Sequence, residues 1–458
     1  MTFKKPEGLK SNLQFIGNNK MSYISPNAEP MVSRRDFLKN SALASTLLMP
    51  SFKEFEKFDS QLLEIKVKRK NKSINSLVRD EEYWKLVRKL FKPQESFVNL
   101  ENGYFSVQPQ STMATQYKWI QEINNQNSLY MRTRQIEEMA SVKKKLAEFT
   151  KLGTDEFVIC RNTTEALDTI IHGYPWQKGD EVIVNHQDYG SMLAAFEQQK
   201  RRSGVKTIYT KLPLHPKSDE EVVAAFESQI TSKTKMILLT HLINLTGQVL
   251  PVKKVIEMAH SHRVEVMLDS AHAFAHIPFY IKDTGADYVG TSMHKWLCCP
   301  IGLGLMYVSK DKIEKIWPLF GDNEYASNDI RKFEHWGTRP NSAMATIPTA
   351  IEFHESIGSE LKFERLFFLK DYWTQQAKEI DGIEVHTPFE KERSGAIANF
   401  SINEQKPSET TKKLFEEHNI FSVAIETPDV NGVRITPHLY NSIEELDMLV
   451  DALKKLVA

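Results

Sequence analysis

Two short motifs, separated by one predicted strand, contain the groups in this sequence that could do chemistry. They are Asp269-Ser-Ala-His272 and Ser292-Met-His294-Lys295. Together they supply a carboxylate, two imidazoles, a hydroxyl and an amine that can form a covalent link to a carbonyl carbon. This set suits an aldehyde cofactor with an aromatic ring nitrogen and a phosphate, namely pyridoxal 5'-phosphate (PLP). The motifs therefore predict an enzyme that acts at the α-carbon of an amino acid.

Lys295 is the candidate Schiff-base amine, which could later carry a proton at Cα. Asp269 closes the apolar run 264–268, and a buried carboxylate there needs a cationic partner, such as a protonated ring nitrogen. The alternative for Asp269 is the N-cap of a helix. His272 could donate a hydrogen bond to the phenolic oxygen of the ring. His272 and His276 also have the spacing of two metal ligands, but no third ligand is in register, so we expect no metal.

The phosphate of such a cofactor has two candidate binding segments. Ser292 and His294 flank the lysine, and both side chains could reach a phosphate. The segment 162–165 has capping-box spacing at the predicted start of a helix. Capping would leave the first-turn amides and the hydroxyls of Thr163 and Thr164 available to an anion. The alternative is simply a well-capped helix.

Three further residues could contact the ring or the substrate. Tyr189 could stack on the ring, with His186 as its competitor and core packing as the alternative for both. Asn244 could bind the phenolic oxygen or the substrate carboxylate, or it could form a turn before Gly247. Arg434 could grip an α-carboxylate with two parallel hydrogen bonds, and its alternative is a surface salt bridge.

The elements that must position these groups are apolar runs that alternate with segments of helical periodicity. This alternation predicts an α/β fold with a mostly parallel seven-stranded sheet and helices on both faces. Ligands bind such sheets at the carboxyl ends of strands, where the motifs lie. The last run follows its predecessor without a helix, so we expect it to pair antiparallel. The runs are 157–160, 181–184, 207–209, 236–239, 264–268, 288–291 and 303–308.

We expect four regions along the chain. They are a signal region (1–50), a charged linker or N-terminal arm that lies on a partner (51–95), a large PLP-binding domain (96–355) and a small α+β domain (356–458). A long helical stretch, 343–371, should join the two domains. The small domain should contain strands at 383–385, 396–401 and 433–435, and helices at 408–418 and 443–456.

The segment Ser33-Arg-Arg-Asp-Phe-Leu-Lys39 resembles a twin-arginine export signal. The apolar run that follows it, 41–50, is too short to span a bilayer. We therefore expect a periplasmic or extracytoplasmic enzyme that the twin-arginine machinery exports, tethered to the membrane if the signal is not cleaved. The alternative is a disordered basic tail.

Composition excludes other classes of protein. Lys plus Arg and Asp plus Glu both number 59, so the chain lacks the basic character of a nucleic-acid binder. Three cysteines, Cys160, Cys298 and Cys299, are too few for a disulfide framework.

From about Phe97 onward the sequence resembles the class V aminotransferase family of fold-type I PLP enzymes, in its isopenicillin N epimerase-like branch. The most specific motifs are Asp-x-x-His, Ser-x-His-Lys and Val-Arg-Ile-Thr-Pro followed by Tyr-Asn. The resemblance implies that Lys295 holds the cofactor, that Asp269 meets the ring nitrogen and that His272 meets the phenolic oxygen. It also implies that Arg434 binds the substrate carboxylate.

The resemblance further implies that Thr164, Ser292 and His294 bind the phosphate. Members of this family are usually homodimers, in which a Gly-Thr of the neighbouring subunit touches the phosphate. Gly337-Thr338 occupies that place, so Thr338 is expected to act in trans.

The same family includes cysteine desulfurases, which use a nucleophilic thiol on a mobile loop of the small domain. No cysteine follows Cys299, so a persulfide mechanism is disfavoured, whereas a C–S lyase that releases its product directly stays open. A non-catalytic PLP-fold binding protein is the remaining alternative. Such a protein would be expected to lose Lys295, Asp269 or Arg434, and all three are present.

Overall fold

The fold is described from a computed structural model, which covers residues 52–457. The twin-arginine motif at 33–39 and the rest of the predicted signal region lie outside the described residues, so export remains a prediction. Within 52–457, the helices are all too short or too polar to cross a membrane.

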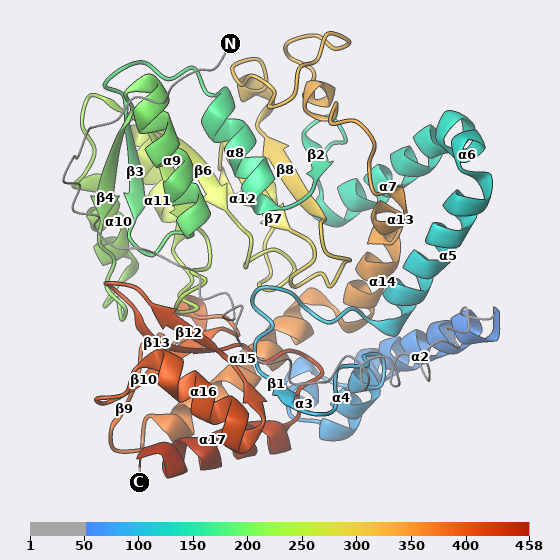
Figure 1. Cartoon of the computed structure of the whole chain (residues 1–458), viewed down its shortest axis with the longest axis vertical. Helices are drawn as coiled ribbons and strands as arrows, with labels where there is room; N and C mark the ends of the chain where they lie inside the picture. The colour runs from blue at the N-terminus through green and yellow to red at the C-terminus, as the bar shows by residue number, and fades with distance from the viewer. Residues whose placement is uncertain (1–51, 458) are drawn as a thin grey trace, which may run out of the picture. The chain divides into compact units, whose positions relative to one another are not determined.

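A seven-stranded sheet forms the centre of the large region, with the strand order β2-β8-β7-β6-β5-β3-β4 (Figure 1). The strands β7, β6, β5, β3 and β4 are parallel, and β8 is antiparallel to both of its neighbours. All seven predicted runs form strands, and the antiparallel pairing expected of the last run is confirmed. The bounds are β2 (Phe157–Cys160), β3 (Glu181–Asn185), β4 (Lys206–Thr210), β5 (Thr234–Thr240), β6 (Glu265–Asp269), β7 (Tyr288–Ser292) and β8 (Gly304–Val308).

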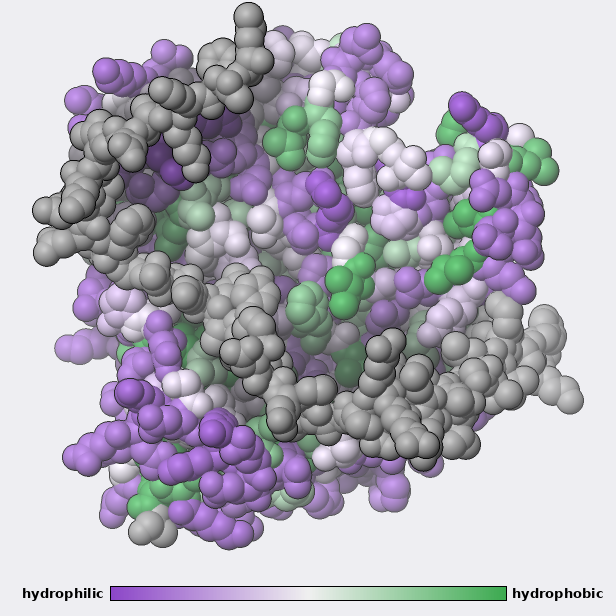
Figure 2. All heavy atoms as spheres, in the orientation of Figure 1, coloured by the Kyte–Doolittle hydropathy of each residue, from purple (hydrophilic) through white to green (hydrophobic). Residues whose placement is uncertain are grey.

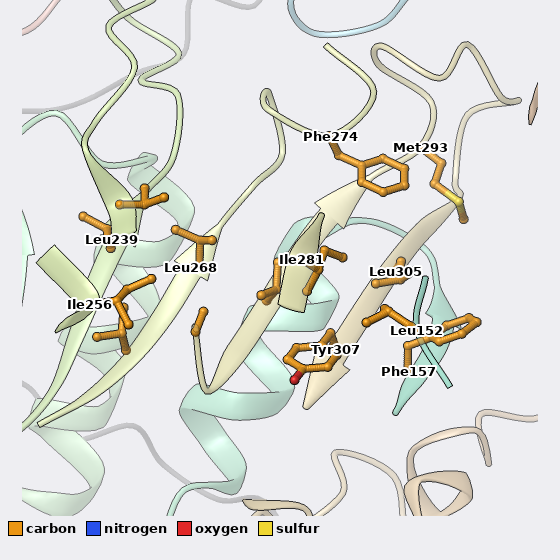
Figure 3. Packing of buried hydrophobic residues seen from close by; sticks show 14 of the residues in the cluster. Leu152, Phe157, Leu239, Ile256, Leu268, Phe274, Ile281, Met293, Leu305 and Tyr307 are labelled. Carbon is orange, nitrogen blue, oxygen red and sulfur yellow. The ribbon is translucent and has the colours of Figure 1, made fainter. Parts of the chain in front are cut away.

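Both faces of this sheet are covered by helices. Successive residues of a strand point to opposite faces, so Ile237 and Leu239 of β5 enter one core cluster while Met236 and Leu238 enter the other. The first cluster, part of which Figure 3 shows, includes residues of α7 (Gln135–Thr150), α10 (Asp219–Glu227), α11 (Val252–Ser261) and α14 (Ile347–Ile357). The second includes residues of α8 (Thr163–Gly173) and α9 (Gly190–Ser203). This burial on both faces explains why the strands are continuous apolar runs.

A smaller antiparallel sheet, with the order β12-β13-β10-β9, follows in the C-terminal region. The predicted strands are present, with β10 beginning two residues later than expected. Two short strands were not predicted, β11 (Ile420–Phe421) and β12, and β11 pairs in parallel with β1 (Val98–Asn99). The other bounds are β9 (Ile383–Val385), β10 (Ala398–Ile402), β12 (Val423–Glu426), β13 (Asn431–Ile435), α16 (Pro407–His418) and α17 (Ile443–Val457).

The helical stretch predicted at 343–371 is broken into three helices rather than continuous. These are α13 (Asn341–Met344), α14 and α15 (Ser359–Ala377). Gly358 separates the last two with a φ of 87°, a left-handed conformation that favours glycine and ends α14. The remaining helices of the large region are α5 (Gln110–Gln126), α6 (Ser128–Thr133) and α12 (Ile281–Thr284).

The segment expected to be a linker or an arm on a partner is helical and packs within its own chain. It forms α2 (Phe52–Lys70), α3 (Ile74–Val78) and α4 (Glu81–Arg88). Leu62, Ile65, Leu77 and Trp84 are buried in a cluster shared with Phe353 of α14 and Leu366 of α15. The expectation of a linker was wrong. A few well-spaced apolar residues among many charged ones are enough to pack these helices against α14 and α15.

Candidate active site

The predicted site residues converge on one cavity of about 250 Å³ at the carboxyl ends of the parallel strands. Three open hollows elsewhere among the described residues are larger, at about 430, 740 and 1070 Å³, but none of them is lined by any of these residues. Nine of the predicted residues line the cavity: Thr163, Thr164, Tyr189, Asn244, Asp269, His272, Ser292, His294 and Lys295. The convergence follows from the topology, because parallel strands end at the same edge of the sheet.

Lys295 lies in the turn after β7 and is partly exposed to the cavity. Its Nζ is 2.8 Å from Nε2 of His272. Burial and, to a lesser extent, the charge of Arg434 lower the pKa of Lys295 to about 8, against the opposing charges of Asp269 and Glu101. About a tenth of this amine is therefore unprotonated, and so nucleophilic, at pH 7.

Asp269 is the last residue of β6 and is buried, with 5% of its surface exposed. Its Oδ1 accepts a hydrogen bond from the backbone N–H of Ala271, at 2.9 Å. No helix follows it directly, so the N-cap alternative does not apply. Burial raises the pKa of this carboxyl, and a cation bound in the cavity would stabilise its charged form. Asp269 thus fits the protonated ring nitrogen of PLP.

Both imidazoles of the two motifs are neutral. Burial lowers the pKa of His272 well below its ordinary value and that of His294 to about 4, and the Lys295 charge contributes to both. Nδ1 of His294 lies 3.1 Å from the carbonyl of Leu303, which leaves Nε2 for the cavity. Nδ1 of His272 is buried without a hydrogen-bond partner in the described part of the chain, so a polar atom of a cofactor could satisfy it.

His276 is engaged in packing rather than paired with His272. Its Nδ1 is 2.8 Å from the carbonyl oxygen of His272, and its Nε2 accepts from the N–H of Ala396 at 2.9 Å. The ring also stacks on Trp296, with ring centroids 3.7 Å apart. Both ring nitrogens are therefore already held by backbone groups.

The anion-binding end of the cavity is the start of α8. The side chain of Asn162 caps this helix by accepting from the N–H of Glu165 at 2.9 Å. The hydroxyls of Thr163 and Ser292 are 2.8 Å apart, which joins the helix start to the end of β7. Gly304 of β8 lies against the same turn, because a Cβ there would come within 2.7 Å of Cα of Asn162. The hydroxyl-bearing residues Thr163, Thr164 and Ser292 thus gather at the start of a helix, where a phosphate can bind.

Tyr189, and not its competitor His186, lines the cavity. His186 is exposed and lies 3.5 Å from a carboxylate oxygen of Asp429.

The carboxylate of Asp188, beside Tyr189 in the sequence, was missed by the sequence analysis. It accepts a hydrogen bond from the hydroxyl of Thr240 at 2.7 Å. Burial raises the pKa of Asp188 to about 7. Its place beside Tyr189 at a strand end was the available signal.

Two predicted residues do not line the cavity. Thr338 is exposed on a loop of its own chain, so its expected action in trans remains a prediction. Arg434 is fully buried and directly contacts two residues of the cavity wall, Asn244 and Tyr104. The two hydrogen bonds that its guanidinium was expected to donate to a substrate carboxylate go to the carboxylate of Glu101. The sequence analysis missed Glu101.

Three exposed side chains, two aromatic and one aliphatic, line the cavity. Tyr104, Phe105 and Ile301 have 37%, 52% and 68% of their surfaces accessible. On the face shown in Figure 2, much of the surface is hydrophilic, and hydrophobic residues form scattered groups, some of them near the middle. The three residues lie in loops without a readable motif, so no pattern in the sequence pointed to them.

A mostly parallel sheet whose strand ends present a lysine, a buried carboxylate and an anion site defines the fold-type I class of PLP-dependent enzymes. The model of the family described as "Aminotransferase class-V" matches residues 106–449, well over half of the chain. The chain belongs to this family, and its cofactor is PLP.

Relatives with different activities match at similar identity. Isopenicillin N epimerase of Amycolatopsis lactamdurans is 25% identical over 335 residues, which cover 69% of this chain and 84% of the relative. A probable cysteine desulfurase of Halalkalibacterium halodurans is 27% identical over 323 residues, which cover 66% and 78%. Among solved structures, a mutant of C-DES with glycine covalently linked to its PLP cofactor matches with a TM-score of 0.74 and 19% identity, covering 80% of this chain and 98% of that one.

Proposed function

We propose that this protein acts at the α-carbon of an amino acid through Lys295, as an epimerase or an aminotransferase. The observation that carries the proposal is the placement of the Lys295 amine on a cavity wall with Asp269 and two neutral imidazoles. When bound, PLP supplies an electron-withdrawing ring that stabilises negative charge at Cα.

The residues of the chain supply the remaining steps. Asp269 holds the ring nitrogen in its protonated form. The amine of Lys295 would hold the cofactor, and it would take the proton from Cα of the substrate as a general base. Its pKa, lowered by burial to about 8, suits this role near neutral pH. His272, 2.8 Å away, orients the Lys295 amine.

The destination of that proton separates the two reactions. Return of the proton to the opposite face of Cα would invert the amino acid, whereas an aminotransferase would not return it to Cα in the same half-reaction. The similarity to isopenicillin N epimerases supports the first outcome, and membership of the class V family is compatible with both.

A C–S lyase that releases its product directly is the second candidate, supported by the similarity to cysteine desulfurases. A persulfide route is less well supported, because Cys160, Cys298 and Cys299 are all buried and none of them lines the cavity. A non-catalytic binding protein would have no need of Lys295 beside Asp269.

We also propose a homodimer in which Thr338 of the partner subunit completes the phosphate site. The exposure of Thr338 away from the cavity of its own chain is compatible with such a role. Export by the twin-arginine machinery, which rests on the motif at 33–39, is part of the same proposal.

The test is to incubate the purified PLP-loaded protein with a panel of L- and D-amino acids, with and without keto-acid acceptors. Chiral separation of the products distinguishes inversion, amino transfer and loss of a side-chain group in one experiment. We expect inversion or amino transfer. Release of sulfide from cysteine or cystine without either of these would favour the lyase, and no reaction with any amino acid would contradict the proposal.

A further inference from the structure

Behind the cavity wall lies a buried ion pair that the proposed reaction does not use. Glu101 and Arg434 are both almost completely inaccessible, with 3% and 0% of their side chains exposed. Oε2 of Glu101 accepts from Nε of Arg434 at 3.0 Å, and Oε1 accepts from Nη2 at 2.8 Å. This is the fork-to-fork geometry in which an arginine binds the carboxylate of a ligand.

Glu101 is fixed in this position. Its Oε1 also accepts from the backbone N–H groups of Gly103 and Tyr104, at 2.8 and 2.9 Å. Its backbone forms a parallel bridge with Thr436, two residues beyond Arg434. A substrate would therefore have to break a buried, charge-assisted network to displace Glu101, and such disruptions are strongly unfavourable.

Little of the Arg434 guanidinium remains for a ligand. Three of its five N–H donors are used, two by Glu101 and one by the carbonyl oxygen of Asn244 at 3.0 Å. The ring of Tyr104 covers one face, 4.4 Å from Cζ. The positive charge of Arg434 is balanced by Glu101, and the buried guanidinium borders the cavity only through Tyr104 and Asn244.

The rest of the wall offers nothing to a second acidic group. Among the described residues that line the cavity, Lys295 is the single lysine or arginine, and PLP engages it. Asp269 and the cofactor phosphate are negative, and the charge of Arg434 is already balanced by Glu101. A side-chain carboxylate would therefore enter a site with no free cation.

We propose that Glu101 is a specificity-determining residue, which balances Arg434 permanently and so restricts the site to amino acids whose side chains carry no negative charge. The inference rests on the proposed function and deepens it by naming the substrate class. Glu101 acts through Arg434 and through its own charge, without contacting the reacting atoms.

The test compares acid and amide substrates of the same size. The PLP-loaded protein is titrated with L-asparagine and L-aspartate, and with L-glutamine and L-glutamate, and the change in cofactor absorbance gives each dissociation constant. We expect the wild type to bind the amide of a pair at least about tenfold more tightly than the acid. In Glu101→Gln, which keeps a side-chain acceptor for Gly103 and Tyr104, this preference should fall by about tenfold.

The matched control is Glu445→Gln, because Glu445 likewise accepts from a backbone N–H, that of Ser442 at the start of α17, but neither lines the cavity nor contacts Arg434. It should keep the wild-type preference. The ratio of the acid and amide dissociation constants is measured within one preparation, so partial unfolding does not change it. If Glu101→Gln fails to fold, the ratio measured for the wild type still tests the proposed substrate class. Equal binding of acid and amide by the wild type, or an unchanged ratio in Glu101→Gln, would overturn the inference. Absence of any spectral response to amino acids would instead contradict the proposed function.

Discussion

Two lysines of this protein, one half-buried and one fully buried, have similarly perturbed amines in very different surroundings. Burial lowers the pKa of both Lys295 and Lys362 to about 8. Lys295 faces the cavity beside His272, whereas Lys362 of α15 is 1% exposed and donates to the backbone carbonyl of Trp296. The Nζ of Lys362 also lies 3.5 Å from Nδ1 of His354.

The difference teaches that a lowered lysine pKa reports burial and not function. Lys362 is surrounded by packed side chains, including the thiols of Cys298 and Cys299, whose charges would raise its pKa. Lys295 has what Lys362 lacks, namely an open cavity, a carboxylate at a strand end and an anion site. Cavity access and partners, more than the pKa itself, identify the reactive amine.

The largest expected effect comes from removing the reactive amine. Lys295→Ala should abolish the covalent link to PLP and lower the rate of α-proton exchange by about 10³-fold or more, because the base is lost. Absorbance spectra and exchange of the substrate α-proton in D₂O measure the two effects. A variant that still exchanges at the wild-type rate would assign the role to another residue.

A smaller loss is expected when the ring nitrogen loses its anionic partner. Asp269→Asn should still form the covalent link, but α-proton exchange should fall by on the order of 10²-fold, because a neutral amide does not keep the nitrogen protonated. The same exchange assay measures this, with bound PLP quantified to correct for occupancy. Exchange at the wild-type rate with full occupancy would contradict the role of Asp269.

Lys362→Met should change stability and leave the cofactor link intact. In the fold the pKa of Lys362 is about 8, below the ordinary 10.5, because of burial, so the unfolded chain binds more protons between these values. Lys362 therefore makes wild-type stability rise with pH through this window. Between about pH 8 and pH 10 the wild type should gain about 2 kcal/mol relative to the variant.

Urea unfolding of both proteins at the two pH values measures the difference. The spectrum of the PLP-loaded variant provides the control, because the Lys295 adduct should be unchanged. If the free energy of unfolding of the two proteins changed equally with pH, or if the variant lost the PLP–Lys295 adduct, the distinction between the two lysines would be contradicted.

The smallest effect is expected from the thiols around Lys362. Burial raises the pKa of Cys298, and that of Cys299 to well above its ordinary value, so both thiols are protonated and inert. A variant with all three cysteines changed to alanine should keep its turnover within a few-fold of the wild type. Loss of activity by orders of magnitude would point to a persulfide route.

Much of this site could be predicted from the sequence because it lies at strand ends. Strands buried on both faces appear as apolar runs, and the polar residues that follow them, such as Asp269 and Ser292, must meet at one edge of the sheet. The choice between Tyr189 and His186 required coordinates, which place Tyr189 on the cavity wall.

What the sequence did not reveal depends on contacts between distant segments. Glu101 precedes the large sheet, and its partner Arg434 follows 333 positions later, so no local pattern links them. From the sequence, Arg434 was expected to bind a substrate carboxylate, because an arginine motif does not show that another side chain already binds its guanidinium. The helices at 52–88 were missed for a similar reason. Their few apolar residues can be recognised as core residues only once they are seen packed against α14 and α15.

The most direct measurement is borohydride reduction of the PLP-loaded protein, followed by peptide mapping. Lys295, Lys362 and Lys370 all have a pKa lowered by burial to about 8, so the pKa alone does not choose among them. We predict that the reduced cofactor is found on the peptide that contains Lys295 and on no other. A label on Lys362 or Lys370, or a protein that takes up no PLP, would contradict the account.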